Sequence, residues 1–165
     1  TFVEGDAKDM HAVKKTVEDT EAVICVKKHA KNSPNNILEV STKNILSAMS
    51  SHGIDRIVIL TGAGVRVKGD QPKFSDRLIV TLLKLMQGQL LKDSKASVQL
   101  IHDSNYDWTV ARAPMLTKKP GSQSYTAGMV GKNTGPKLSR ENAATFLLDA
   151  IEKKEYIQQS PMISD

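Results

Sequence analysis

The residues best placed for chemistry follow a short aliphatic run in the middle of the sequence. Arg56 to Leu60 is too short for a helix and is closed by Gly62 and Gly64. Such a run predicts a parallel strand that is buried on both faces. In open α/β sheets, ligands bind in the crevice beyond the strand ends. We therefore expect a ligand at Thr61 to Val65, which offers a hydroxyl, glycines and free backbone groups.

The single cysteine and the charge pattern narrow the class of protein. Cys25 cannot form an internal disulfide and lies in an apolar run, so we interpret it as a reduced, buried thiol in a cytoplasmic protein. Net charge is +5, but only Lys27, Lys28 and Lys31 cluster, and aromatic residues make up 4%. We expect no nucleic-acid partner, because an anionic cofactor or a solvated surface explains the charge as well. No metal site is expected.

The composition is that of a globular domain, with 39% hydrophobic and 25% charged residues in 165. We expect a single domain over residues 1–165, a monomer, and no membrane span, since no apolar run approaches about 18 residues. The chain begins with Thr1 rather than methionine, and Phe2-Val3 resembles the middle of a strand. This indicates a fragment or a processed chain.

Strands and helices are predicted to alternate along the chain, which implies βαβ units and a doubly wound parallel sheet. Phe2 to Glu4 is expected to be the end of a first strand. Lys118 to Pro136 is expected to be a long loop with a short strand near Tyr125. Strands are expected at Ala22–Val26, Arg56–Leu60, Trp108–Ala111 and Met162–Ile163. Helices are expected at Asp9–Glu18, Ile37–Ser51, Ser75–Leu91, Asp93–His102 and Arg140–Lys153, with Gly53 and Ser139 as end signals.

One helix carries more apolar surface than a single core-facing side needs. Between Leu78 and Leu91 two adjacent apolar rows run along the predicted helix. Either this helix is buried, or the stripe is a partner or substrate surface.

A collinear set of segments resembles a known family. It comprises Val-Glu-Gly-Asp at 3–6, Ala-Val-Ile-Cys-Val at 22–26, Thr-Lys-Asn-Ile-Leu-Ser-Ala-Met at 42–49, Gly-Ile-Asp-Arg-Ile-Val at 53–58, Tyr-Asp-Trp-Thr-Val-Ala-Arg-Ala-Pro at 106–114 and Leu-Ser-Arg-Glu-Asn-Ala-Ala at 138–144. In order and spacing these segments resemble the atypical short-chain dehydrogenase/reductases of the NmrA-like group, most of all its flavin reductases. The resemblance implies a Rossmann-like fold and NADP(H) as cofactor, with NAD(H) possible.

Cofactor-binding positions follow from this resemblance. It places Asp6 and the adjacent Ala7 beside the adenine; Asp6 could instead cap the next helix. At Val26 and Lys27 relatives carry small residues, whereas a lysine here could meet a phosphate as a point charge.

The resemblance also implies which residues bind the nicotinamide end of the cofactor, and these residues lie in two segments. Leu60, Thr61 and Gly62 match the positions that line the nicotinamide, and Ala113, Pro114 and Met115 match those at its carboxamide. Thr61 is the candidate catalytic hydroxyl, although a strand-end threonine can also satisfy local backbone groups. Flavin reductases carry a histidine where Met115 stands, and the Tyr-xxx-Lys pair of ordinary short-chain dehydrogenases is absent from the sequence.

The first βαβ unit, with the glycine-rich turn that holds the pyrophosphate, has no counterpart in the sequence. We therefore expect this chain alone to bind dinucleotide weakly or not at all. The expected function is an NAD(P)H-dependent reductase of flavin or a similar planar conjugated substrate, because direct hydride transfer needs little acid catalysis. The alternative is a non-catalytic dinucleotide-binding sensor or protein-interaction module. An epimerase or dehydratase is a third, weaker hypothesis.

Overall fold

The computed structural model describes residues 2–30 and 32–165, apart from the side chains of residues 75, 76, 79, 80, 83, 84 and 86. Five strands form the main sheet in the order β1–β2–β3–β7–β5. Their bounds are β1 Ala22–Val26, β2 Arg56–Gly62, β3 Asp107–Ala113, β7 Met162–Ser164 and β5 Thr126–Gly128. The first four run parallel, and β5 is antiparallel to β7.

The predicted doubly wound parallel sheet is therefore confirmed at its centre. β1 and β2 lie side by side and parallel, with Val26 opposite Leu60, and Gly62 of β2 lies opposite Ala113 of β3. The carboxyl ends of the three strands consequently meet at one edge, where a ligand is expected. The short strand predicted near Tyr125 is confirmed as β5, although its antiparallel pairing with β7 was not predicted. A small parallel pair was also not predicted, formed by β4 (Met115–Thr117) and β6 (Lys137–Ser139).

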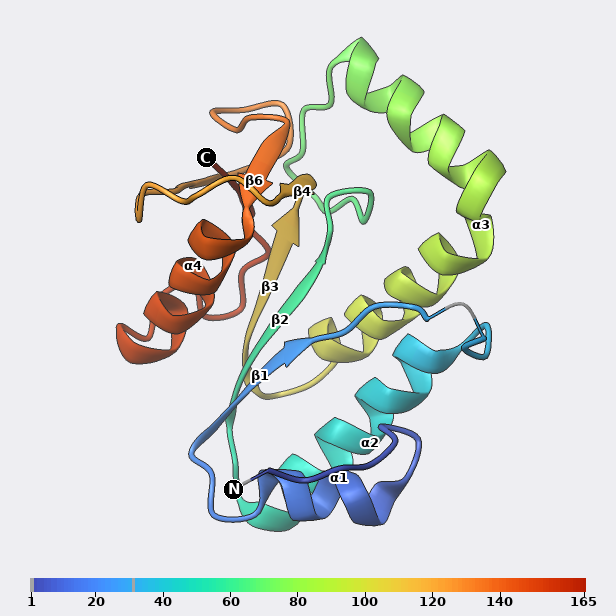
Figure 1. The fold of residues 1–165 in the computed structure, drawn as a ribbon, viewed down its shortest axis with the longest axis vertical. Coiled ribbons are helices and arrows are strands. Elements are labelled where there is room, and N and C mark those ends of the chain that lie inside the picture. Colours follow the sequence, from blue (N-terminus) through green and yellow to red (C-terminus); the bar gives the residue numbers. More distant parts are fainter. Residues whose placement is uncertain (1, 31) are drawn as a thin grey trace.

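Helices cover both faces of the sheet, as Figure 1 shows, with α4 on one side of β2 and β3 and α2 and α3 on the other. The helices are α1 (Met10–Val17), α2 (Ile37–His52), α3 (Phe74–His102) and α4 (Arg140–Glu152). The period of two along β2 assigns the two cores: Ile57 and Ile59 face α2 and α3, while Val58 faces α4. Each fully buried aliphatic side chain contributes about 1.5–3 kcal/mol.

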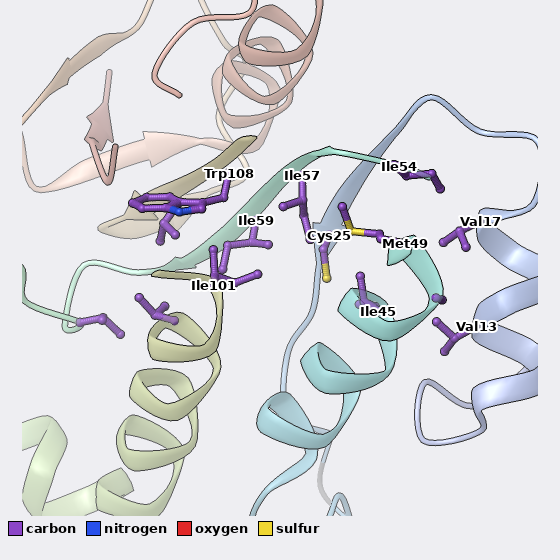
Figure 2. Close-up of a cluster of buried hydrophobic side chains, with 14 residues drawn as sticks. Val13, Val17, Cys25, Ile45, Met49, Ile54, Ile57, Ile59, Ile101 and Trp108 are labelled. Carbon is purple, nitrogen blue, oxygen red and sulfur yellow. The ribbon is translucent and has the colours of Figure 1, made fainter. Parts of the chain in front are cut away.

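The larger core lies under α1, α2 and α3, and Figure 2 shows it around Ile59 and Cys25. The indole of Trp108 lies across β3 near Ile101 of α3, and Cys25 projects from β1 towards Ile45 of α2. Cys25 is buried, as predicted, and burial raises the pKa of its thiol.

Local end signals behave as the sequence predicts. Gly53 ends α2 in a left-handed conformation with φ of 66°, and its N–H donates to the carbonyl of Met49. Ser139 caps α4 by accepting a hydrogen bond from the backbone N–H of Asn142. Asp9 likewise caps α1.

Three element predictions need correction. Phe2 to Glu4 is not a strand, because it pairs with no described strand, and Phe2 is 89% exposed. The two helices predicted on either side of residue 92 do meet at a break, but the break lies at Gln87, whose φ of −139° and ψ of 39° are not helical; the two halves together are α3. β2 extends to Gly62, so Thr61 and Gly62 belong to the strand rather than to the loop after it.

The apolar stripe on α3 divides at the kink. Before it, Leu78, Leu82 and Leu85 are 61%, 55% and 81% exposed; in Figure 1 this half of the helix extends beyond the strand ends. The second predicted row lies partly outside the described side chains, at Ile79, Leu83 and Met86. After the kink Leu91, Val98 and Ile101 join the core. The exposed row favours a surface over a buried helix for the first half.

Candidate functional site

A cleft of about 620 Å³ opens at the carboxyl ends of the central strands, and we call it the strand-end cleft. β1 supplies one wall, the end of β2 supplies the floor, and the start of the β3–β4 connection supplies the other wall. α2 and the middle of α3 close the remaining side. Seven of the ten predicted cofactor residues line it: Val26, Lys27, Leu60, Thr61, Gly62, Ala113 and Pro114.

The other three predicted residues lie elsewhere. Asp6 is exposed and accepts a hydrogen bond from the backbone N–H of Lys8 at 2.9 Å, an interaction that lowers its pKa. The carbonyl of Ala7 accepts a bond from Asn44 of α2. Met115 is 59% exposed and pairs in β4 with Lys137 of β6. The adenine role of Asp6 and Ala7 stays a prediction, as does the carboxamide role of Met115.

Thr61 is the hydroxyl at the floor of the strand-end cleft. It is part-buried, and within the described part of the chain its side chain makes no hydrogen bond to protein. Beside it, a Cβ added at Gly62 would meet no atom within 4 Å, so a flat group has room at this strand end. The backbone N–H of Ala63 donates to the carbonyl of Ala113 at 2.7 Å, which ties the ends of β2 and β3 together.

The side chain of Lys27 turns away from the strand ends towards α2. Its ammonium donates to the hydroxyls of Ser41 and Thr42, both at 2.8 Å, and to the carbonyl of Leu38 at 3.2 Å. Burial lowers the pKa of this lysine, and the charges of Cys25 and Asp93 oppose that shift. A phosphate contact through Lys27 would have to break three hydrogen bonds, whereas the exposed Lys28 lines the same cleft. The phosphate role of Lys27 stays a prediction.

The N-terminus of α2 faces this region but is already capped by another element. Its own N-cap, Asn36, makes no side-chain capping bond. Instead the buried Asp93 of α3 accepts from the backbone N–H groups of Leu38 and Glu39, each at 2.9 Å. His29 shares the same carboxylate at 2.7 Å. The carboxylate occupies the place that a phosphate would take, so this helix end is not a free anion site.

A buried ion pair fixes the loop that follows β2. Arg112 of β3 is fully buried, and its guanidinium contacts both carboxylate oxygens of Asp70, at 2.7 and 3.0 Å. Asp70 also accepts from the backbone N–H groups of Val67 and Val130, and Arg112 donates to the carbonyl of Val65. Burial alone would raise the pKa of Asp70, but these hydrogen bonds and the positive charge lower it below its usual value. The pair therefore holds the rim of the strand-end cleft.

Several residues of the cleft were not foreseen from the sequence. They come from α2 and α3, from the segment after β1 and from the start of α4: His29, Leu38, Gln87, Leu90, Leu91, Ser94, Ser97 and Arg140. Leu90, Ser94 and Ser97 share one helical face, but only the packing of α3 beside α2 shows that this face meets the strand ends. Within the described residues, no group of three His, Cys, Asp or Glu side chains could hold a metal ion.

The strand-end cleft would suit the nicotinamide half of a dinucleotide, because there is open space at Gly62, Leu60 and Pro114 form walls, and Lys28 and Arg140 are cations beside an anionic cofactor. The N-termini of α1, α2 and α4 offer no equal match for its pyrophosphate, because carboxylates or a hydroxyl already cap them. The nicotinamide roles of Leu60 to Gly62, Ala113 and Pro114 stay predictions.

Comparison with known proteins agrees with this architecture. The fold is that of an NAD(P)H-binding, oxidoreductase-like α/β protein. Residues 1–154 match the family described as NAD(P)H-binding, and the chain belongs to that family. The resemblance to the short-chain dehydrogenase/reductases of the NmrA-like group is thereby confirmed, and so is the expectation of an NAD(P)H cofactor at the level of the family.

Solved structures share the fold at low sequence identity. A short-chain dehydrogenase/reductase from Veillonella parvula is 17% identical with a TM-score of 0.81, covering 100% of this chain and 72% of that one. The same organism's protein in complex with NADP is 18% identical, with a TM-score of 0.79 and the same coverage. ChuY, an anaerobillin reductase from Escherichia coli O157:H7, is 14% identical with a TM-score of 0.71, covering 98% and 73%. Within the described residues, no helix is long and apolar enough to cross a membrane.

Proposed function

We propose that this chain serves an NAD(P)H-dependent reductase that acts on flavin or a similar planar conjugated substrate. The observation that carries the proposal is the strand-end cleft itself, where Thr61 and Gly62 meet Ala113 and Pro114 between largely apolar walls. NADP(H) is the proposed form of the cofactor, and the NADP complex of the Veillonella parvula protein supports this choice. The anaerobillin reductase among the fold neighbours supports a planar conjugated substrate.

The tyrosines are committed to other contacts, which argues against carbonyl reduction of the ordinary kind. Tyr106 donates to the carbonyl of Leu46 and Tyr125 donates to Asp149, while Tyr156 packs against Phe146. None of the three lines the strand-end cleft in the described part of the chain. Flavin reduction suits such a site, because the bound nicotinamide supplies the hydride and the protein mainly orients the two rings.

The residues that line the strand-end cleft would have three roles in this reaction. Leu60, Gly62 and Pro114 would bind and orient the nicotinamide, while Leu90 and Leu91 of α3 would exclude water from the cleft. The hydroxyl of Thr61 would hold a proton at Oγ1 beside the acceptor. Lys28 and Arg140 would attract the anionic cofactor.

The test is oxidation of NADPH on addition of FMN, measured through the absorbance of the reduced nicotinamide. It is run on this chain and on the chain extended by a glycine-rich strand–helix–strand unit, which we expect to bind NADPH far more tightly. Replacing Thr61 by valine should lower kcat with FMN by less than about tenfold, since a general acid that carried the reaction would be worth at least about a hundredfold. Thr145→Val, which alters a half-buried threonine of α4 that does not line the cleft, is the control. NADPH binding without oxidation would refute the reductase.

That outcome would support the second candidate function, a non-catalytic dinucleotide-binding sensor or interaction module. The exposed row of Leu78, Leu82 and Leu85 on α3 favours it, because a partner could cover these side chains. Their replacement by serine should leave NADPH oxidation unchanged if the chain is a reductase without such a partner.

A further inference from the structure

A second cavity of about 780 Å³ lies on the other side of α3 from the strand-end cleft, and we call it the α3–β5 cavity. α3 forms one wall after its kink, the loop after β2 forms the roof, and β5 and the segment before β7 form the opposite wall. The two cavities share one lining residue, Val65. Because β3, β7 and β5 lie at the end of the sheet away from β1, this cavity is separate from the proposed cofactor site.

The floor of the α3–β5 cavity is aromatic. The rings of Trp108 and His102 lie 4.6 Å apart at an interplanar angle of 33°, and His102 Nε2 is 2.9 Å from the hydroxyl of Ser160. Figure 2 shows the indole of Trp108 beside Ile59 and Ile101, at the edge of the larger core. Met129 and Tyr156 complete the apolar lining. Thioether and aromatic groups around an indole suit a flat ring, which they contact through dispersion and stacking.

The rim of the same cavity is cationic. Lys68 of the loop and Lys95 of α3 line it together with Arg66, and no acidic side chain is among its described lining residues. Asp70, in the same loop, is paired with the buried Arg112 and is not available to neutralise these lysines. Gln99 and Gln159 add neutral hydrogen-bonding groups. Such a lining attracts an anion and can orient it over the aromatic floor.

We propose that the α3–β5 cavity is a second binding site, for a small planar aromatic molecule that carries a carboxylate. The ring would lie against Trp108, and the carboxylate would meet Lys68 and Lys95. The site is independent of the reductase proposal, because it uses none of the residues assigned to the nicotinamide. Residues 65 to 67 separate the two sites, and they are held by the ion pair of Asp70.

Trp108 provides a direct readout, because it is the single tryptophan of the chain. Its fluorescence is titrated with 4-nitrobenzoate, a planar aromatic carboxylate that quenches indole on contact, and with the neutral 4-nitrobenzamide. Free N-acetyltryptophanamide corrects for absorption and collisional quenching. We expect saturable quenching by the acid and at least tenfold weaker binding of the amide. The affinity for the acid should fall with added salt, because the contacts are exposed charges.

Variants test the assignment of the cations. Lys68→Gln and Lys95→Gln should each weaken 4-nitrobenzoate binding by about threefold, and the double variant by about tenfold. Lys14→Gln, on the exposed face of α1, is the matched control and should change nothing. The proposal is overturned by non-saturable quenching, by equal affinity for acid and amide, or by Lys95→Gln behaving like the control. Competitive displacement of the acid by NADP⁺ would also overturn it, since the probe would then occupy the strand-end cleft.

Discussion

The ion pair between Arg112 and Asp70 gives the sharpest prediction, and the change is Asp70→Asn. The side chains are 0% and 4% exposed, and the carboxylate accepts two hydrogen bonds from the guanidinium and two from backbone N–H groups. Asparagine keeps the shape but removes the charge and leaves the guanidinium buried without a counter-ion. Breaking a buried pair from one side costs about 3–5 kcal/mol. For a chain of this length that corresponds to a fall in Tm of roughly 6–20 °C.

The cost should depend on pH, with a sign that follows from the pKa of Asp70. Its pKa is lowered in the folded protein. The pair therefore stabilises the fold fully above the unfolded-state pKa, about 3.9, and this stabilisation is lost as pH falls through the lower folded-state value. The difference in free energy of unfolding between wild type and Asp70→Asn should be largest near about pH 7 and should shrink below about pH 4.

Urea unfolding followed by Trp108 fluorescence measures both effects. Asp19→Asn is the matched control, because Asp19 is exposed and has a positive φ of 56° that asparagine tolerates. It should change the free energy of unfolding by less than about 0.5 kcal/mol. If Asp70→Asn lowers the free energy of unfolding by less than about 1 kcal/mol, or by an amount that does not change with pH, the ion pair does not hold the loop after β2.

Three further changes test other contacts. Gly131→Ala should lower the free energy of unfolding, measured in urea, by at least about 2 kcal/mol, because Gly131 has a φ of +79° and an added Cβ would collide with a backbone carbonyl. Gly88→Ala should raise it by about 0.5–1 kcal/mol, because an added Cβ there meets open space. Equal effects of the two substitutions would contradict this. Asp93→Ala should lower the free energy of unfolding by about 1–2 kcal/mol, because it removes the carboxylate that caps α2. An unchanged free energy of unfolding would show that water replaces the cap. If the chain binds NADPH, Lys28→Ala should weaken NADPH binding by about threefold. Lys27→Ala should weaken it by less, because the Lys27 ammonium already donates hydrogen bonds to Ser41 and Thr42. A larger effect of Lys27→Ala in a binding titration would support the phosphate role of Lys27.

Local patterns in the sequence were sufficient to predict most of the helices and the parallel strands at the centre of the sheet. The aliphatic run at Arg56 to Leu60, the stop at Gly53 and the cap at Ser139 all specify structure through contacts with near neighbours. The same patterns brought Leu60 to Gly62 and Ala113 to one edge, because parallel strands must end together. The end of β2 at Gly62 was missed since a glycine normally marks a turn.

Tertiary structure alone decided which side chains from the helices join the strand ends, and how the charged groups pair. Asp93 caps α2 by accepting from the backbone N–H of Leu38, 55 residues earlier, and Asp70 meets Arg112 across 42 residues. Hydrophobic periodicity says which face of an element is buried, but it does not name the partner of a charge so far along the chain. For the same reason the sequence could not show that Lys27 turns towards α2, or that Lys68, Lys95 and the single tryptophan surround one cavity. Those placements depend on how whole elements pack, and packing is a property of the folded chain.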